Sequence, residues 1–193
     1  MTATPRILAF AGSARRDSYN KKLVRIAAAG ARAAGVEVTT VDLRDYPMPI
    51  MDEDLEASEG MPAHAQAFKE LLLDHQGLLI AAAEYNSSVT PLLKNTLDWA
   101  SRKGPGRLQA WPFEGKVAAV LCASPGALGG MRALVHLRAI LGNIGVLVLP
   151  EQVVIPKAHE AFLPDGGLKD PQRQSAVAAL GARLAHVVGR LHA

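Results

Sequence analysis

This chain of 193 residues is poor in cysteine and aromatic residues. Cys122 is the sole cysteine, which excludes an intrachain disulfide, and no Cys/His cluster has the spacing of a zinc site. No apolar run reaches the ~18 residues that a membrane helix needs. No charged segment followed by a long apolar run marks a secretory signal at the N-terminus. These absences predict a cytoplasmic protein that holds no metal and does not insert into membranes.

The low aromatic content also bears on nucleic acid binding, which we do not expect. The chain has two Trp, three Tyr and four Phe, and no basic stripe is interleaved with them. Its formal net charge of +3 is typical of a mildly basic soluble protein, although a surface for anionic ligands is an alternative interpretation. The length and the ordinary balance of apolar and charged residues predict one domain over residues 1–193.

Strand and helix patterns alternate along the chain, which predicts an α/β fold with a parallel sheet between two helical layers. In such sheets ligands bind beyond the carboxyl ends of the strands, where strand order reverses. The expected strands are 6–12, 36–42, 77–83, 117–123 and 146–149, with 153–155 as an extension of the last. The expected helices are 19–34, 63–75, 90–101, 129–141 and 170–190, and the acidic segment 48–62 is typical of a polar loop.

The loop after the first strand has the composition of a phosphate-binding turn. It contains Ser13, Ser18 and Asn20 as side-chain donors, and the following helix adds unpaired N–H groups and a favourable dipole. It lacks both the Lys of a P-loop and the G-x-G-x-x-G of a dinucleotide fold. The alternative is an ordinary polar turn between a strand and a helix.

Two further loops would share the same edge of the sheet. The segment 84–91 carries Tyr85 and Asn86 where a flat polar ligand could lie, although packing at the sheet edge is an equal alternative for Tyr85. The segment 124–130 is rich in glycine, which lets a backbone approach a ligand closely. We expect Trp99, in the helix after the second loop, to pack in the core, and Cys122 to be an inert thiol within an apolar strand.

The three loops together resemble the NADPH-dependent FMN reductase family of flavodoxin-like proteins, which includes quinone, chromate and azo-dye reductases. The resemblance runs from the first strand to the fifth. It rests on Gly12-Ser13-x-Arg15-x-x-Ser18-x-Asn20, Glu84-Tyr85-Asn86-x-Ser88, Leu93-Lys94-Asn95-x-x-Asp98-Trp99 and Ser124-x-Gly126-x-x-Gly129-Gly130-x-Arg132. The chain departs from the family pattern at Ala83, where Pro is usual, at Ser87, where Gly is frequent, and at Thr90-Pro91, where Pro-Gly is usual.

The resemblance implies a flavodoxin-like three-layer sandwich with strand order 2-1-3-4-5, and FMN as cofactor. Arg15 would contact either the FMN phosphate or a phosphate of the nicotinamide cofactor, the alternative being a solvated surface arginine. The residues implied in FMN binding are Ser13, Arg15, Ser18, Tyr19, Asn20, Ala83, Glu84, Tyr85, Asn86, Ser124, Gly126 and Gly129.

The implied activity is hydride transfer from NADPH or NADH to flavin N5, and then to a second acceptor, in a ping-pong cycle. Quinones, azo dyes, chromate and free flavin are the acceptors that the resemblance suggests. No catalytic side chain is required, and we expect His136 at a surface or subunit contact rather than as a proton donor. The family also implies a homodimer or homotetramer.

Two other functions remain open from the residues. The first is an FMN-binding electron carrier without its own NAD(P)H activity, although carrier flavodoxins tend to be strongly acidic and this chain is not. The second is a phosphate-binding α/β protein that holds no flavin.

Overall fold

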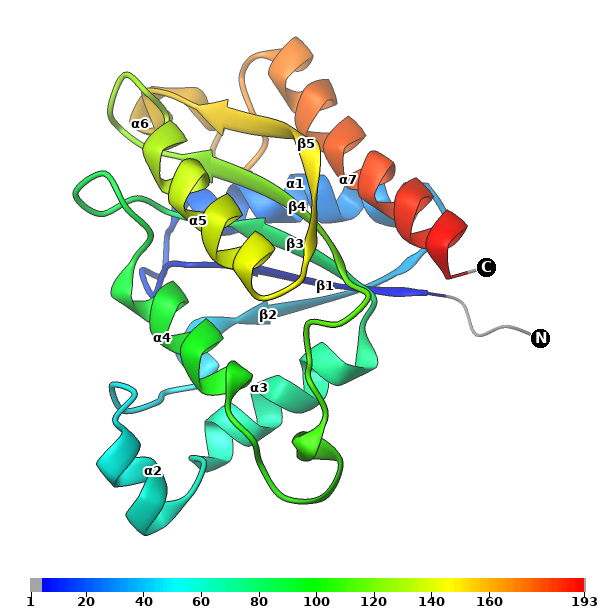
Figure 1. Cartoon of the computed structure of the whole chain (residues 1–193). Coiled ribbons are helices and arrows are strands. Elements are labelled where there is room, and N and C mark those ends of the chain that lie inside the picture. The colour runs from blue at the N-terminus through cyan, green and yellow to red at the C-terminus, as the bar shows by residue number, and fades with distance from the viewer. Residues whose placement is uncertain (1–4, 193) are drawn as a thin grey trace.

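The computed structural model describes residues 5–192, in which five parallel strands form one sheet of order β2-β1-β3-β4-β5. Helices cover both faces of the sheet (Figure 1). The helix–sheet–helix sandwich that the sequence predicted and the strand order that the family resemblance implied are therefore confirmed. The strands are β1 (Arg6–Ala11), β2 (Glu37–Asp42), β3 (Gly77–Ala81), β4 (Val117–Ala123) and β5 (Leu147–Ile155).

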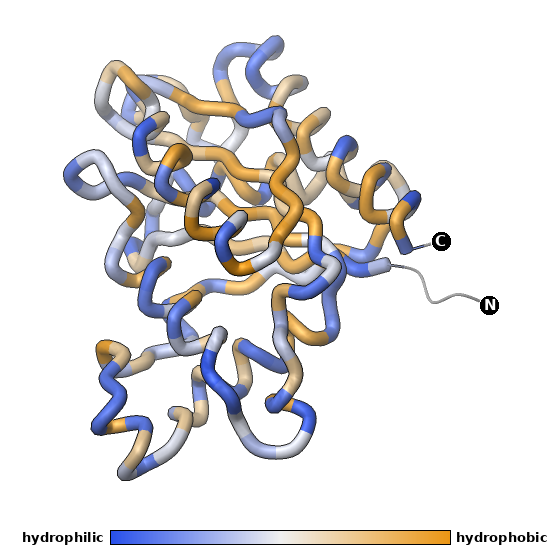
Figure 2. Tube along the Cα trace, viewed as in Figure 1, coloured by the Kyte–Doolittle hydropathy of each residue, from blue (hydrophilic) through white to orange (hydrophobic). Residues whose placement is uncertain are grey.

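The two helical layers pack on opposite faces because side chains alternate along each strand. In β1, Ile7 and Ala9 pack with one apolar cluster, whereas Leu8 and Phe10 pack with the other. The first cluster includes α1 (Tyr19–Ala33) and α7 (Pro171–Leu191); the second includes α3 (Ala63–Asp74), α4 (Pro91–Ser101) and α5 (Met131–Asn143). Figure 2 shows the resulting hydrophobic centre. Burial on both faces explains the continuous apolar runs of β1, β3 and β4.

Two short helices were not expected from the sequence. The segment predicted as a polar loop contains α2 (Glu53–Glu59), whose first turn is capped by the Asp52 carboxylate through the Asp54 N–H. None of its side chains is buried, so it has no apolar periodicity that could have revealed it. The second, α6 (Ala158–Ala161), is a single turn after β5. Two 3-10 turns, Leu43–Asp45 and Gly106–Gln109, complete the described elements.

The last strand is continuous, so the two short runs predicted at 146–149 and 153–155 belong to one element. Ala118 of β4 pairs with Val148, but Val120 pairs with Gln152, so three residues of β5 stand opposite Ala119 alone and β5 has a bulge of two extra residues. The bulge contains Pro150, which has no N–H to donate to a ladder. A break in periodicity at the proline thus marks a bulge rather than the end of the strand.

The arrangement places three loops at one edge of the sheet. Because all strands run parallel, β1, β3 and β4 all end at that edge, and α1, α4 and α5 begin there. Within residues 5–192, no helix combines the length and the hydropathy that crossing a membrane requires.

Candidate functional site

The loops after β1, β3 and β4 surround a cleft of about 200 Å³. All of the sequence-predicted site residues line it except Asn86, Gly126 and Gly129, which lie in the same loops. Two lining residues were missed by the sequence reasoning, namely Ala123 and Pro125, which flank the predicted Ser124 at the end of β4. The lining residues are Ser13, Arg15, Ser18, Tyr19, Asn20, Ala83, Glu84, Tyr85, Ala123, Ser124 and Pro125.

One end of the cleft is built to receive an anion. Ser18 is the N-cap of α1, and its Oγ accepts the Asn20 N–H at 3.2 Å. Within residues 5–192, the backbone N–H groups of Ser13, Ala14 and Arg15 donate to no protein acceptor. These donors and the positive end of the α1 dipole meet at the same place. The first loop can therefore bind a negatively charged group through its backbone.

The first and second loops are tied together by Thr90. Its Oγ1 donates to the Gly12 carbonyl at 2.7 Å and accepts the Leu93 N–H at 3.1 Å, so the same side chain also caps α4. The chains approach so closely that a Cβ on Gly12 would lie 2.3 Å from the Ala82 carbonyl oxygen. Glycine is therefore required at position 12 by space alone.

The first and third loops are tied together by Asn20. Its Nδ2 donates to the Ala123 carbonyl at 2.9 Å, and its Oδ1 accepts the Ala123 N–H at 2.8 Å. Both bonds join the first turn of α1 to the end of β4. Asn20 thus fixes the separation of two walls of the cleft.

The second and third loops are tied together by Glu84, whose Oε2 accepts the Ala133 N–H in the first turn of α5 at 3.0 Å. Gly130 precedes this helix with φ +88°, and a Cβ there would lie 2.0 Å from the Cys122 Sγ. Burial, followed by the charge of Glu84, raises the pKa of the Cys122 thiol to about 12. The thiol stays protonated at neutral pH, and its predicted place in the core is confirmed.

The second loop begins with a tight turn. Tyr85 and Ser88 exchange both backbone hydrogen bonds at 3.0 Å, and Asn86 and Ser87 between them have φ of +49° and +69°. Two consecutive residues at positive φ characterise a type I′ turn, in which glycine is favoured at the second position. Serine at position 87 therefore sits in a left-handed conformation that glycine would adopt at lower cost.

Two side chains of α5 hold this turn. The Arg132 guanidinium donates to the Ser87 Oγ at 3.2 Å, and the His136 Nδ1 lies 2.9 Å from the Ser88 Oγ. Tyr85 as a whole residue is 59% exposed beside the cleft. His136 is on the protein surface, as predicted, but it also supports the second loop.

Ala83, where the family pattern has Pro, lies at φ +55°. A proline ring holds φ near −65°, so this backbone conformation is closed to it. The departure from the family pattern thus coincides with a left-handed residue in the cleft wall.

Two motif residues of α4, Asn95 and Trp99, stabilise a neighbouring segment of the fold and do not line the cleft. The Asn95 side chain accepts the Met51 N–H and donates to the Pro49 carbonyl, both at 2.8 Å. The Trp99 Nε1 donates to the same carbonyl at 2.8 Å. Trp99 is fully buried, which confirms its predicted place in the core. Both side chains fix segment 48–51 against α4.

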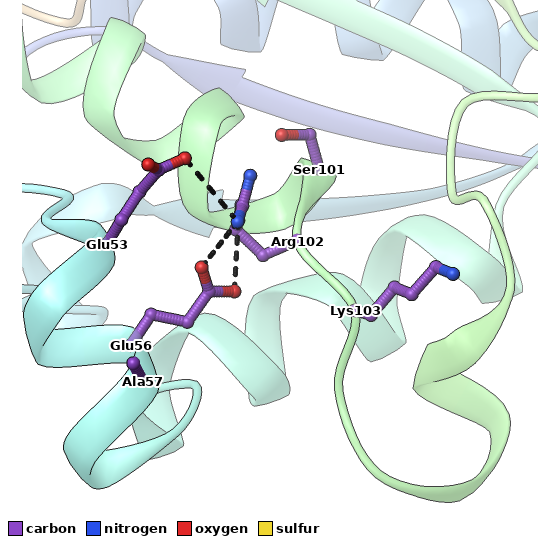
Figure 3. A pocket seen from close by; sticks show the side chains of 6 residues that line it. All are labelled: Glu53, Glu56, Ala57, Ser101, Arg102 and Lys103. Atoms are coloured by element: carbon purple, nitrogen blue, oxygen red, sulfur yellow. Dashed lines mark hydrogen bonds and ion pairs between the residues drawn. The ribbon is translucent and has the colours of Figure 1, made fainter.

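A larger cavity, of about 600 Å³, lies between α2 and the end of α4 (Figure 3). Arg102 and the two glutamates that line it are already paired with one another. Arg102 forms ion pairs with Glu56 at 2.6 Å and Glu53 at 3.8 Å, and the Arg102 carbonyl accepts the buried Lys69 ammonium at 2.5 Å. Among the charged residues that line it, only Lys103 forms no ion pair within residues 5–192, so this cavity offers less to a ligand than the unpaired N–H groups of the smaller cleft. The acidic segment is therefore docked by Arg102 rather than simply solvated.

A separate buried cluster lies at the opposite edge of the sheet, where β3 and β4 begin. The Lys116 ammonium donates to the His75 carbonyl, and burial lowers the pKa of Lys116 to about 8. The His75 ring lies between the Leu71 carbonyl and the Thr39 hydroxyl, and burial is the main cause that lowers its pKa. These groups affect stability and lie away from the cleft.

Comparison with known proteins assigns the family. The profile of the NADPH-dependent FMN reductase family matches residues 5–160, and this range includes all three cleft loops. The chain belongs to this family, which confirms the resemblance drawn from its motifs. The class defined by fold and site is therefore a flavin-dependent oxidoreductase, with FMN as cofactor and NAD(P)H as co-substrate.

Individual relatives are similar over most of their length. The chain is 35% identical over 173 residues to an NAD(P)H-dependent FMN reductase of Pseudomonas aeruginosa, covering 89% of each chain. It is 35% identical over 162 residues to a 2-hydroxy-1,4-benzoquinone reductase of a Burkholderia species, covering 84% of each. The solved structure of FerB, a flavoenzyme NAD(P)H:(acceptor) oxidoreductase from Paracoccus denitrificans, matches with TM-score 0.74 and 27% identity over 96% of this chain and 99% of that one.

The residues of the cleft fit an FMN molecule by their donor set. Unpaired N–H groups and the Ser13 and Ser18 hydroxyls gather at one end, as a phosphate requires. The other end is walled by Tyr85 and by the loop after β4, which contains no charged residue from Ser124 to Gly130. An anion-binding end and a loop wall without charged residues match the phosphate and the ring system of a flavin mononucleotide.

Proposed function

We propose that this protein is an FMN-dependent NAD(P)H oxidoreductase that works by a ping-pong mechanism. Bound FMN supplies the redox chemistry, with N5 taking hydride from NAD(P)H and a second small molecule receiving the electrons. The observation that carries the proposal is the cleft at the carboxyl edge of the sheet, with an anion-binding end formed by the α1 N-terminus. Membership of the family supports it.

We assign the cleft residues to FMN, within a single binding domain over residues 1–193. Ser13, Arg15, Ser18 and the free N–H groups of the first loop bind the phosphate, and Asn20 holds that loop against β4. The full proposed set is Ser13, Arg15, Ser18, Tyr19, Asn20, Ala83, Glu84, Tyr85, Asn86, Ser124, Gly126 and Gly129.

The remaining loops orient the ring system and stabilise charge. The three side-chain ties through Thr90, Asn20 and Glu84 hold the walls in place before the ligand arrives, so little reorganisation is needed on binding. Backbone N–H groups of segment 124–130 are the donors that we assign to the negative charge left on the ring by reduction. No acid or base from the protein is needed for hydride transfer.

The second substrate is a small oxidant, for which we propose the quinone class among quinones, azo dyes, chromate and free flavin. Relatives named as quinone reductases support this choice. We also propose a homodimer or homotetramer in the cytoplasm. Apolar residues left exposed in the loop before α5 and in its first turns, namely Leu128 (45%), Met131 (44%) and Val135 (60%), support contact between copies.

The test begins with purified protein. Reconstitution with FMN should give a flavin absorbance spectrum, and anaerobic NADPH should bleach it, after which a quinone should restore it. Protein that binds FMN without being bleached by either NADPH or NADH would be a carrier rather than a reductase. Protein that cannot be reconstituted with FMN would contradict the proposal altogether.

A variant tests the anion end directly. Ser13→Asp places a negative charge among the phosphate donors and should weaken FMN binding at least tenfold, or about 1.4 kcal/mol. Ser175→Asp, at an exposed position of α7, is the matched control and should bind FMN normally. Unchanged affinity in Ser13→Asp would remove Ser13 from the site. Fluorescence titration gives both constants.

A further inference from the structure

Three side chains form a stack at the anion end of the cleft. The Arg15 guanidinium carbon lies 4.6 Å from the centre of the Tyr19 ring, which is within the range of a cation–π contact. The Tyr19 ring lies 5.7 Å from the Phe162 ring, at an interplanar angle of 14°. The stack therefore joins the first loop to the start of α1 and to the residue that ends α6.

The guanidinium of Arg15 is held by this stack and not by a carboxylate. Asp17, the only acid between Gly12 and Ser18, is paired with Lys22 at 2.8 Å, which is the main reason that its pKa is lowered. Within residues 5–192, no carboxylate lies at ion-pair distance from Arg15. A guanidinium that stacks by its face keeps the N–H groups of its edge available.

Phe162 provides a firm base for the stack. Its backbone pairs with Leu168, and the following Leu163 N–H donates to the Gly167 carbonyl at 2.7 Å. Phe162 and Tyr19 both pack against the apolar cluster between the sheet and α1. Phe162 lies outside the cleft lining and just beyond the residues that match the family, so no motif marks it.

We propose that Phe162, acting through Tyr19, is a positioning residue that holds the Arg15 guanidinium ready to bind the phosphate monoester of a nucleotide. This inference rests on the proposed function. Arg15 and Tyr19 both line the cleft beside Ser13 and Ser18, so the phosphate chemistry of the site is already present there. The two sources of such a group are the 5′-phosphate of FMN and the 2′-phosphate of NADPH.

The test compares Phe162→Leu, which removes the ring, with Phe162→Tyr, which retains it. Dissociation constants are measured for FMN and for riboflavin, which has the same ring system and no phosphate. If Arg15 binds the 5′-phosphate of FMN, Phe162→Leu should weaken FMN binding about fivefold to tenfold and leave riboflavin binding unchanged. Phe162→Tyr should then bind FMN as the unaltered protein does. If Arg15 instead binds the 2′-phosphate of NADPH, Phe162→Leu should leave FMN binding unchanged. The FMN-loaded variant should then bind NADPH more weakly and NADH as tightly as the unaltered protein.

A double variant shows whether the effect passes through Arg15. If it does, Phe162→Leu should have no further effect in an Arg15→Gln background. An equal effect in that background, equal weakening of FMN and riboflavin, or no effect on any phosphorylated ligand would overturn the inference. Wild-type protein that fails to bind FMN would instead contradict the proposed function, so the two failures are distinct.

Discussion

The tie between Glu84 and α5 provides the sharpest test of how the cleft is held. Replacing Glu84 by alanine removes the acceptor of the Ala133 N–H and a negative charge from the first turn of the helix. Losing a helix-capping acceptor costs about 0.5–2 kcal/mol. Losing a negative charge at a helix N-terminus costs about 0.3–1 kcal/mol. We therefore expect Glu84→Ala to lower the free energy of unfolding by about 2 kcal/mol.

Glu84→Gln separates the two contributions. The amide oxygen can still accept the Ala133 N–H, so only the charge is lost, and the expected decrease is about 0.5 kcal/mol. Urea denaturation at pH 7 measures both variants. With a slope of about 2 kcal/mol per M, the midpoint should fall by about 1 M for alanine and about 0.25 M for glutamine. Glu114→Ala, at an exposed position without an ion pair in residues 5–192, is the matched control.

The same variants report on the cofactor. In wild-type protein, Glu84 holds the second and third loops together before FMN binds. In Glu84→Ala, FMN binding itself must order these loops, so the affinity for FMN should fall about tenfold, or about 1.4 kcal/mol. Glu84→Gln should retain most of the affinity because the hydrogen bond survives. The reasoning is refuted if Glu84→Ala is as stable as the Glu114→Ala control and binds FMN as tightly as the unaltered protein.

Three other outcomes follow from the geometry. The pKa of Lys116 is about 8 in the folded chain and 10.5 in the unfolded chain, where the side chain is solvated. Between pH 8 and pH 10.5 the unfolded chain therefore binds more protons than the folded chain. The free energy of unfolding should rise by about 3 kcal/mol across that pH window relative to the Lys116→Met variant, because the comparison cancels the contribution of all other titrating groups. Parallel pH profiles of stability for the two proteins would contradict this. Gly130→Ala, with a Cβ 2.0 Å from the Cys122 Sγ and φ +88°, should cost more than about 3 kcal/mol in a urea titration. Gly142→Ala, within α5 and with open space around a Cβ, should gain about 0.5–1 kcal/mol, and a similar change in stability for the two variants would refute the packing argument. Ser87→Gly relieves a left-handed residue at φ +69° and should gain at least about 0.5 kcal/mol in thermal unfolding, whereas a loss would show that its Oγ contact dominates.

Much of the fold was predictable because its periodicities are strong. The apolar runs of β1, β3 and β4 indicated strands covered on both faces, and Thr90-Pro91 indicated the start of α4. Elements without a buried face gave no such signal. The helix α2 is stabilised by its cap and by Arg102, which follows the last residue of α4 far along the chain. No local pattern in residues 48–62 contains that partner.

Which three loops form the cleft could also be predicted from the sequence, since each loop follows the end of a strand and contains glycine or hydroxyl residues. How the loops are joined was not visible. Asn20 was assigned to a ligand, yet its amide bonds to the backbone of Ala123, and Phe162 supports Arg15 from outside every motif.

The order of residues alone therefore determined the class of fold, the edge of the sheet at which the cleft lies and the family to which the chain belongs, because these depend on local periodicity and on short motifs. Only the tertiary structure decided which hydrogen-bond donors remain available to a ligand and which form hydrogen bonds within the protein. That division depends on contacts between residues as distant as Asn20 and Ala123, whose hydrogen bonds exist only once the strands are side by side.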